Sequence, residues 1–290
     1  MKPAPFTYRR PASLDDAVDL LAGSPGAKVL AGGQSLVPLL SMRLAAPEML
    51  VDINALPGLD HVRCSADGVR VGALARHSAV LASAEARATQ PLLALALGNV
   101  AHPTIRNRGT SVGSLVHADA AAELPAVLSL LGGSVDVVGP RGRRTIPAAE
   151  LYVGPLESSV RADEIAVEAF FPALAEGGGV AFAELARRHG DYALCGVAAL
   201  VRLEGDGQDE RVVEARLGYL SVCDVPTVVD VTGVAVEDAG DVALRELDPA
   251  DDIHATAHYR AQLVRVLTER VLRAAHDDAR ARRTPVEGLP

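Results

Sequence analysis

The first part of the chain alternates short apolar runs with segments of helical periodicity. Ser13 opens the sequence SLDDAVDLLA, in which a capping residue and two acidic residues precede apolar positions spaced for a helix. Apolar runs at 27–33 and 50–54 are typical of short strands, and a helix is expected between them with Ser35 as its N-cap. This alternation predicts a fold that mixes helices with strands.

The same alternation continues to residue 171. The expected elements are a strand at 68–76, helices at 77–88, 91–100 and 120–131, a strand–turn–strand unit at 134–147, and a strand at 164–171. The stretch from His102 to Ser114 is polar and contains glycine, so it is expected to be a loop.

The pattern changes after the segment ALAEGGG at 173–179, whose three consecutive glycines predict a flexible joint. Two long β-type runs around a polar turn occupy 193–222, which predicts an antiparallel hairpin. A last helix is expected at 254–280. Its apolar positions recur at steps of three and four, and they are Tyr259, Leu263, Val266, Leu267, Val271 and Leu272.

Composition and charge exclude several classes of function. Of the 290 residues, 28 are basic and 37 are acidic, so the net charge of −9 argues against a nucleic acid or an anionic membrane surface as partner. No apolar stretch is long enough for a transmembrane segment, and the N-terminus lacks a signal-peptide core, which predicts a cytoplasmic protein. Cys64, Cys195 and Cys223 are too far apart in sequence to supply an iron–sulfur cluster or zinc from this chain.

Two glycine-bearing segments are candidates for binding an anionic ligand. Ala31, Gly32, Gly33, Gln34 and Ser35 follow a strand and precede a helix, where glycines allow close approach of a ligand to backbone N–H groups. The second segment, IRNRGTSVGS at 105–114, adds two arginines and several hydroxyls. Neither segment matches a Rossmann or P-loop fingerprint, so a tight turn and a solvated loop without ligand are the alternatives.

Two further segments carry chemical side chains. His117, Asp119 and Glu123 lie within seven residues, which suits metal ligation or acid–base chemistry, although Glu123 in a first helical turn is equally explained by the helix dipole. The segment RRHGDYA at 187–193 offers Tyr192 to a flat ring, or it is an exposed turn at the start of the hairpin.

Taken together, three segments resemble one family in order and spacing. The segments are AGGQSLVPLLSMRLAAPEMLVDIN, IRNRGTSVGSLVHADAAAELPAVLSLLG and FAELARRHGDYALCGVAAL. They resemble the FAD-binding medium subunits of molybdenum hydroxylases, of the carbon monoxide dehydrogenase type, and the resemblance extends to the terminal helix. It implies an α+β fold: a two-lobed FAD-binding domain of vanillyl-alcohol-oxidase type at 1–175, with lobes at about 1–57 and 58–175, and a smaller C-terminal α/β domain with an antiparallel sheet and a long terminal helix at 176–290.

The resemblance also implies a role for each motif. Two turns would hold the FAD diphosphate through backbone N–H groups, Glu123 would contact sugar or ribityl hydroxyls, and Tyr192 would cover the flavin ring. The implied cofactor-binding residues are Lys28, Val29, Ala31, Gly32, Gly33, Gln34, Ser35, Thr110, Ser111, Val112, Gly113, Ser114, Glu123 and Tyr192. No side chain of this chain is expected to be catalytic or to bind a metal.

The second turn departs from the family pattern, because Val112 stands where a first glycine is usual. A side chain there would crowd the diphosphate or oppose a positive φ, at a cost of about 1–3 kcal/mol if the backbone kept a glycine conformation. FAD nevertheless remains the expected cofactor, because the first turn and the flanking IRNRGT are intact.

The resemblance implies an electron-transfer subunit. Its expected partners are a large molybdenum-cofactor subunit and a small iron–sulfur subunit, and FAD on this chain would pass electrons to an external acceptor such as NAD or a quinone. Two alternatives remain open on account of Val112: a stand-alone FAD-dependent oxidoreductase that acts directly on a small molecule, or a scaffold that has lost FAD.

Overall fold

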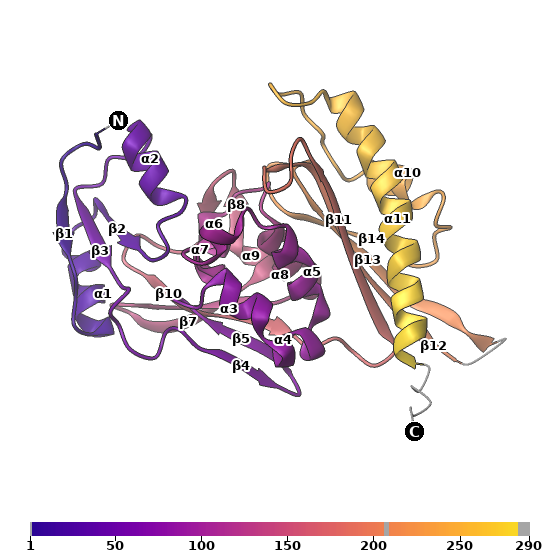
Figure 1. The fold of residues 1–290 in the computed structure, drawn as a ribbon, viewed down its shortest axis with the longest axis horizontal. Coiled ribbons are helices and arrows are strands. Elements are labelled where there is room, and N and C mark those ends of the chain that lie inside the picture. Colours follow the sequence, from indigo (N-terminus) through magenta and orange to yellow (C-terminus); the bar gives the residue numbers. More distant parts are fainter. Residues whose placement is uncertain (1, 206–208, 284–290) are drawn as a thin grey trace.

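The computed structural model describes residues 2–205 and 209–283. Three regions follow one another along the long axis of the molecule, from the N-terminal lobe at one end to a long helix at the other (Figure 1). The mixture of helices with parallel and antiparallel sheets confirms the α+β prediction at the level of fold class.

The N-terminal lobe is a small parallel sheet in the order β1-β3-β2. Its elements are β1 (Thr7–Arg9), α1 (Leu14–Ala22), β2 (Ala27–Leu30), α2 (Leu36–Met42) and β3 (Met49–Asp52). Ser13 caps α1 as predicted, since its Oγ accepts a hydrogen bond from the N–H of Asp16. The helix α2 crosses from β2 to β3, so the carboxyl ends of these two strands lie side by side, which is where ligands of parallel sheets usually bind.

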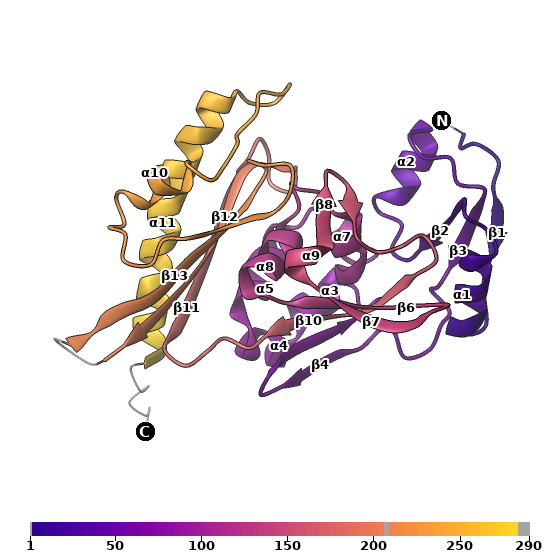
Figure 2. The ribbon, with the colours of Figure 1, turned by 180° about the vertical axis from the view of Figure 1, so that it is seen from behind.

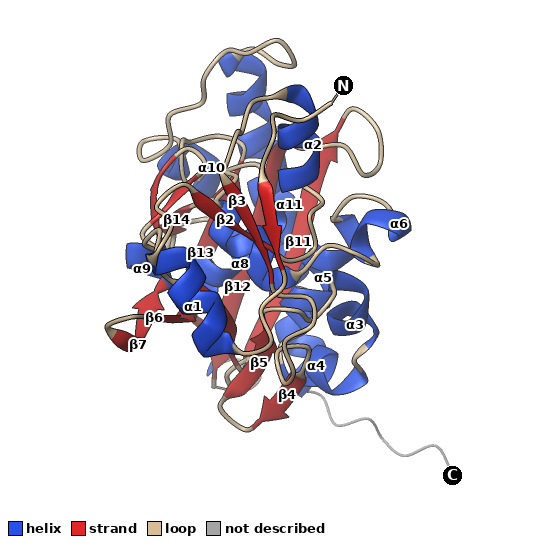
Figure 3. Cartoon of the chain, turned by 90° about the vertical axis from the view of Figure 1, so that its left-hand side faces the viewer, coloured by secondary structure: helices blue, strands red, loops and turns tan. Residues whose placement is uncertain are grey.

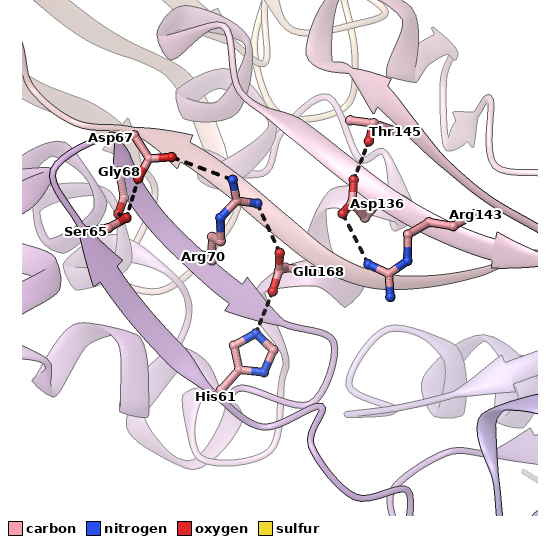
Figure 4. Close-up of polar contacts among 9 residues, drawn as sticks. All are labelled: His61, Ser65, Asp67, Gly68, Arg70, Asp136, Arg143, Thr145 and Glu168. Atoms are coloured by element: carbon pink, nitrogen blue, oxygen red, sulfur yellow. Dashed lines mark hydrogen bonds and ion pairs between the residues drawn. The ribbon is translucent and has the colours of Figure 1, made fainter.

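The middle region is an antiparallel sheet in the order β4-β5-β10-β6-β7. Its strands are β4 (Val62–Ser65), β5 (Gly68–Gly72), β6 (Ser134–Gly139), β7 (Gly142–Pro147) and β10 (Ile165–Pro172). Buried and half-exposed residues alternate along β10, which is expected of a sheet with one face on the core. On the other face, Glu168 pairs with His61 at 2.7 Å and with Arg70 at 3.2 Å, and Asp136 pairs with Arg143 (Figure 4).

Helices cover the core-facing side of this sheet. They are α3 (His77–Ala82), α4 (Ala84–Thr89), α5 (Pro91–Asn99), α6 (Pro103–Arg106), α7 (Ser111–His117), α8 (Glu123–Leu131) and α9 (Ala148–Leu151), with a small hairpin of β8 (Tyr152–Gly154) and β9 (Glu157–Ser158) beside them.

Two predictions about these helices are wrong. A single helix at 77–88 is not observed, because Ser83 is extended and caps the separate helix α4 through its Oγ. The stretch 102–114 is not a plain loop, since it contains α6 and the beginning of α7.

The C-terminal region is an antiparallel sheet between helices. The sheet runs in the order β11-β12-β13-β14, with β11 (Gly178–Ala186), β12 (Ala193–Glu204), β13 (Arg211–Leu220) and β14 (Thr227–Asp230), followed by α10 (Ala239–Ala243) and α11 (Ala257–Arg283). One face packs on α11 and the other on α8, as Figure 2 shows. Figure 3 shows the chain from the side of the N-terminal lobe. The predicted hairpin at 193–222 is confirmed as β12 and β13.

Other details of this region differ from prediction. Gly178 and Gly179 belong to β11 and are not a flexible joint. A Cβ at Gly179 would lie 2.2 Å from the carbonyl oxygen of Ala275, so this glycine serves close packing of α11 on the sheet. Along α11, Tyr259 and Val266 are 44% and 47% exposed and do not belong to the buried stripe. Within the described residues, no helix is long and apolar enough to cross a membrane.

Candidate functional site

The first glycine segment forms the wall of a pocket. Residues 31–35 leave β2 and enter α2, and Gly33 has a φ of +72°, a left-handed conformation that favours glycine. A left-handed residue in such a turn points successive N–H groups to one side, as anion-binding nests require. The pocket has a volume of about 420 Å³. Its lining residues are Leu30, Ala31, Gly32, Gly33, Gln34, Val37, Pro38, Asp52, Asn54 and Arg108.

The second segment lies directly against the first, although more than 70 residues separate them in sequence. A Cβ on Gly32 would lie 2.5 Å from the carbonyl oxygen of Arg108 and 2.8 Å from Cα of Gly109. Only glycine permits this approach of two backbones. The fold therefore brings the two predicted segments together at one place, with Arg108 reaching the pocket.

A polar network that sequence reasoning missed links the two segments. The Asn54 side chain donates to the carbonyl oxygen of Ala31 at 2.8 Å. Arg76 donates to Oδ1 of Asn54 at 2.8 Å and to the carbonyl oxygen of Arg108 at 2.6 Å. The only sequence signal for Asn54 and Arg76 is that each ends an apolar strand-like run, where polar side chains of a sheet edge gather.

Asp52 adds the one carboxylate of the pocket lining. It ends β3, and it accepts hydrogen bonds from the Tyr8 hydroxyl and from the N–H of Asn54. The hydrogen bond to Asp52 raises the pKa of the Tyr8 hydroxyl. These contacts hold the acidic side chain at the carboxyl edge of the parallel sheet.

The conformation of the second segment differs from the predicted turn. Thr110 caps α7, with its Oγ1 accepting the N–H of Gly113 at 3.2 Å, and residues 111–114 form the first turn of that helix. Val112 is only 2% exposed, belongs to the main core and does not have a positive φ. The expected backbone strain at Val112 is therefore wrong. Gly113 is the position that needs glycine, because a Cβ there would lie 2.5 Å from Oγ1 of Thr110.

A buried histidine supports the same segment from behind. The backbone N–H of His77 donates to the carbonyl oxygen of Gly109, and its Nδ1 lies 3.3 Å from Oγ of Ser111. Burial, aided by the nearby Arg106, lowers the pKa of His77 to about 4, so the ring is neutral at pH 7. His77 is thus a packing residue of the predicted site.

Acidic and aromatic side chains meet where α8 packs on the C-terminal sheet. Tyr192, in the loop from β11 to β12, is 65% exposed, and partial burial together with the nearby Asp119 and Glu123 carboxylates raises the pKa of its hydroxyl. Glu123 is the first residue of α8, and burial, with nearby Glu184 on β11, raises its pKa to about 8. Burial also raises the pKa of Glu184 to about 7.

The predicted site residues fall into three groups. Residues 31–34 line the pocket, and 110–114 pack behind it as the start of α7. Glu123 and Tyr192 lie near each other at the other end of α7. Lys28 is exposed on β2 and Val29 packs on the main core, so neither lines the pocket, and the Ser35 side chain makes no capping hydrogen bond.

The donor set fits a dinucleotide better than a metal. A glycine turn, an arginine and a carboxylate around one pocket suit a diphosphate and a sugar, whereas neither Glu123 nor Tyr192 belongs to the lining of this pocket. Within residues 2–205 and 209–283, no group of three or more histidine, cysteine or acidic side chains is placed to hold a metal ion. His117, Asp119 and Glu123 were candidates for such a group, and they do not form one.

Comparison with known families covers most of the chain. Residues 4–174 match the family described as the FAD binding domain in molybdopterin dehydrogenase. Residues 180–275 match the CO dehydrogenase flavoprotein C-terminal domain.

Individual relatives match over their full length. The 6-hydroxypseudooxynicotine dehydrogenase complex subunit alpha of Paenarthrobacter nicotinovorans is 43% identical, with 97% of each chain covered. The caffeine dehydrogenase subunit beta of Pseudomonas sp. is 38% identical, with 95% or more of each covered. A chain of carbon monoxide dehydrogenase from Hydrogenophaga pseudoflava superimposes with a TM-score of 0.89 at 34% identity, covering 96% of this chain and 99% of that one.

Proposed function

Because the chain belongs to the FAD-binding medium subunits of the molybdopterin dehydrogenases, with FAD as its cofactor, we propose that it is the subunit through which such a complex delivers electrons to an external acceptor. In this proposal, electrons reach the bound flavin from iron–sulfur clusters of a small partner subunit, after substrate oxidation at a molybdenum cofactor in a large one. The acceptor would be NAD, a quinone or another oxidant.

One observation carries the flavin part of this proposal. Gly32 fits against residues 108–110 so closely that a single added carbon would overlap the backbone. Such a contact brings two loops with anion-binding chemistry together beside one pocket.

The cysteines of this chain and the names of its relatives support assigning the iron–sulfur clusters and the choice of substrate to other subunits. Cys64, Cys195 and Cys223 are free thiols distributed over different elements, so cluster ligands have to come from another chain. Free thiols also fit a reducing compartment such as the cytoplasm. Relatives named for a nicotine derivative, caffeine and carbon monoxide share this subunit, which supports placing substrate choice in another subunit.

The residues of this chain would act by binding and orientation. Backbone N–H groups of 31–35 would receive the diphosphate, with Arg108 contributing positive charge and Asp52 accepting from a sugar hydroxyl. Glu123 would contact ribityl hydroxyls, and Tyr192 would lie against the flavin ring. Residues of the first lobe line the pocket together with Arg108 of the second, which is compatible with a two-lobed FAD domain of the vanillyl-alcohol-oxidase type. When bound, the flavin supplies the redox chemistry, accepting electrons and passing them on.

The argument for the two alternative functions no longer holds. Both a stand-alone oxidoreductase and a scaffold without FAD were favoured only by the side chain of Val112, which in the structure points into the core at the first turn of α7. No other described feature favours either.

The test begins with the colour of the purified chain. We expect a flavin absorption spectrum and stoichiometric FAD after denaturation. The flavin of the chain should then be reduced anaerobically when the large and small subunits and a substrate of the complex are added, and not by the substrate alone. Reduction by a small substrate without partners would support the stand-alone alternative, and a colourless chain that fails to take up added FAD would refute the proposal.

A further inference from the structure

Arg260 occupies a position that costs the fold free energy. It lies in the first turn of α11, where the helix dipole disfavours a positive charge, and the residue is only 6% exposed. Burial of a guanidinium is unfavourable unless its N–H groups are well paired. The contacts of this side chain should therefore show what it stabilises.

Those contacts close the end of the C-terminal sheet. Nη1 of Arg260 donates to the carbonyl oxygens of Leu194 and Ser221, at 2.5 and 2.6 Å, and Nη2 donates to the Asp252 carboxylate. Leu194 and Ser221 lie just beyond Gly196 and Leu220, the last residues that pair β12 with β13, although β12 still pairs with β11 there. One guanidinium thus joins two strands where their own ladder has ended.

The two carbonyl groups belong to the two segments that build the ring end of the proposed flavin site. Leu194 follows Tyr192 by two residues. Ser221 has a left-handed φ of +64°, and its N–H donates to the carbonyl oxygen of Ala120 at 2.9 Å. Ala120 lies in the short connection that carries Asp119 and Glu123.

Two short routes of contacts therefore start at Arg260. One runs through the Leu194 carbonyl group to Tyr192, and the other runs through Ser221 and Ala120 to Asp119. The Tyr192 hydroxyl lies near enough to the Asp119 carboxylate for that charge to raise its pKa. The approach of Tyr192 to Asp119 depends on both segments staying in register.

We propose that Arg260 is a positioning residue for the flavin site, which holds Tyr192 and the Asp119–Glu123 connection in register through the carbonyl groups of Leu194 and Ser221. The inference rests on the proposed function, because it assigns Tyr192 to the flavin ring. Arg260 itself touches neither of the predicted FAD-binding segments.

The test compares bound-flavin emission in the full chain for Arg260→Met and for Tyr192→Leu, since an aromatic ring stacked on a flavin quenches its fluorescence. We expect Arg260→Met to raise the emission per bound FAD by half or more of the rise caused by Tyr192→Leu. The double variant should add nothing to Tyr192→Leu. Arg144→Met is the matched control: Arg144 pairs with the buried Glu164 in the middle region, so its loss should lower the melting temperature without changing the emission.

If Arg260→Met does not fold, the same emission measurement is made on Arg260→Lys and Asp252→Asn. Each keeps a cation at the site and removes part of the contacts, so each should give a smaller rise in emission. A melting temperature that falls while emission stays at the wild-type value, in every Arg260 and Asp252 variant that folds, would overturn the proposal.

A readout without FAD separates this proposal from the proposed function. Absorbance titration of tyrosinate, with Tyr192→Phe subtracted, gives the pKa of Tyr192, which partial burial and the nearby Asp119 hold above its usual value. We expect Arg260→Met to lower that pKa and Arg144→Met to leave it unchanged. A wild-type chain that binds no FAD would refute the proposed function, whereas an unchanged Tyr192 pKa in the Arg260 variant would refute the positioning role alone.

Discussion

Replacement of Gly32 by alanine tests the contact that builds the site. The added Cβ would lie 2.5 Å from the carbonyl oxygen of Arg108, whereas ordinary contact begins near 3.4 Å, so one backbone has to move by 0.9 Å. Overpacking of this kind costs about 1–3 kcal/mol. The chain can keep the strain, which lowers its stability, or release it by moving residues 108–110 away from the first turn.

Release is the expected response, because the neighbouring residues Asn107 and Arg108 are exposed and have room to shift. A displaced second segment no longer supports the first turn as a diphosphate nest. If the full cost falls on the bound state, FAD affinity drops about 5-fold to 150-fold, since each 1.4 kcal/mol is tenfold. The assay is a fluorescence titration of the apo chain with FAD, together with its melting temperature.

Gly98 provides the matched control for the same chemical change. It lies in α5, and a Cβ there would meet nothing within 4 Å. Gly98→Ala should therefore retain FAD affinity and stabilise the chain by up to about 1 kcal/mol through helix propensity. Wild-type FAD affinity and melting temperature in Gly32→Ala would refute the argument that this contact holds the site together.

Three other variants test separate parts of the structure. Asn54→Ala should weaken FAD binding by about 2-fold to 12-fold in the same titration, since it removes hydrogen bonding worth about 0.5–1.5 kcal/mol that links the two segments. An unchanged dissociation constant would exclude that link. Gly179→Ala should destabilise the chain by about 1–3 kcal/mol in urea unfolding, because the new Cβ overlaps the carbonyl of Ala275, yet the folded protein should bind FAD normally. Burial raises the pKa of Glu123 to about 8. The folded apo chain therefore binds more protons than the unfolded chain between about pH 5 and pH 8. Its free energy of unfolding should fall as pH rises through that window, by up to about 1.4 kcal/mol per pH unit. Glu123→Gln should flatten this slope and stabilise the apo chain at pH 8, as measured by urea unfolding at three pH values; an equal slope in the variant would contradict the assignment.

The sequence predicts structure correctly where the conformation of a segment depends on its own neighbouring residues. The Ser13 cap, the first glycine turn and the β12–β13 hairpin all depend on neighbours in sequence, and each is observed. The break at Ser83 was missed, since a serine inside an apolar helical pattern is compatible with either a continuous helix or a new cap.

Contacts between distant segments set the remaining features. The link from Asn54 to Arg76 joins the segments that follow β3 and β5, which belong to different sheets, and no spacing in the sequence predicts it. The three glycines at 177–179 predict a flexible joint, because glycine allows the most backbone conformations. In the structure Gly179 is required by a helix almost 100 residues later in the chain.

The segment at 105–114 shows most clearly that resemblance to a family motif does not determine the local backbone conformation. If its glycines served a left-handed turn, Val112 would be costly. The segment instead begins a helix, so the requirement changes: position 112 faces the core and needs an apolar side chain, while position 113 faces the Thr110 cap and tolerates no Cβ. Valine followed by glycine satisfies both conditions. A glycine at 112 would leave a cavity in the core and lower the helix propensity of α7. Valine at this position, although it departs from the family pattern, therefore stabilises the fold of this chain.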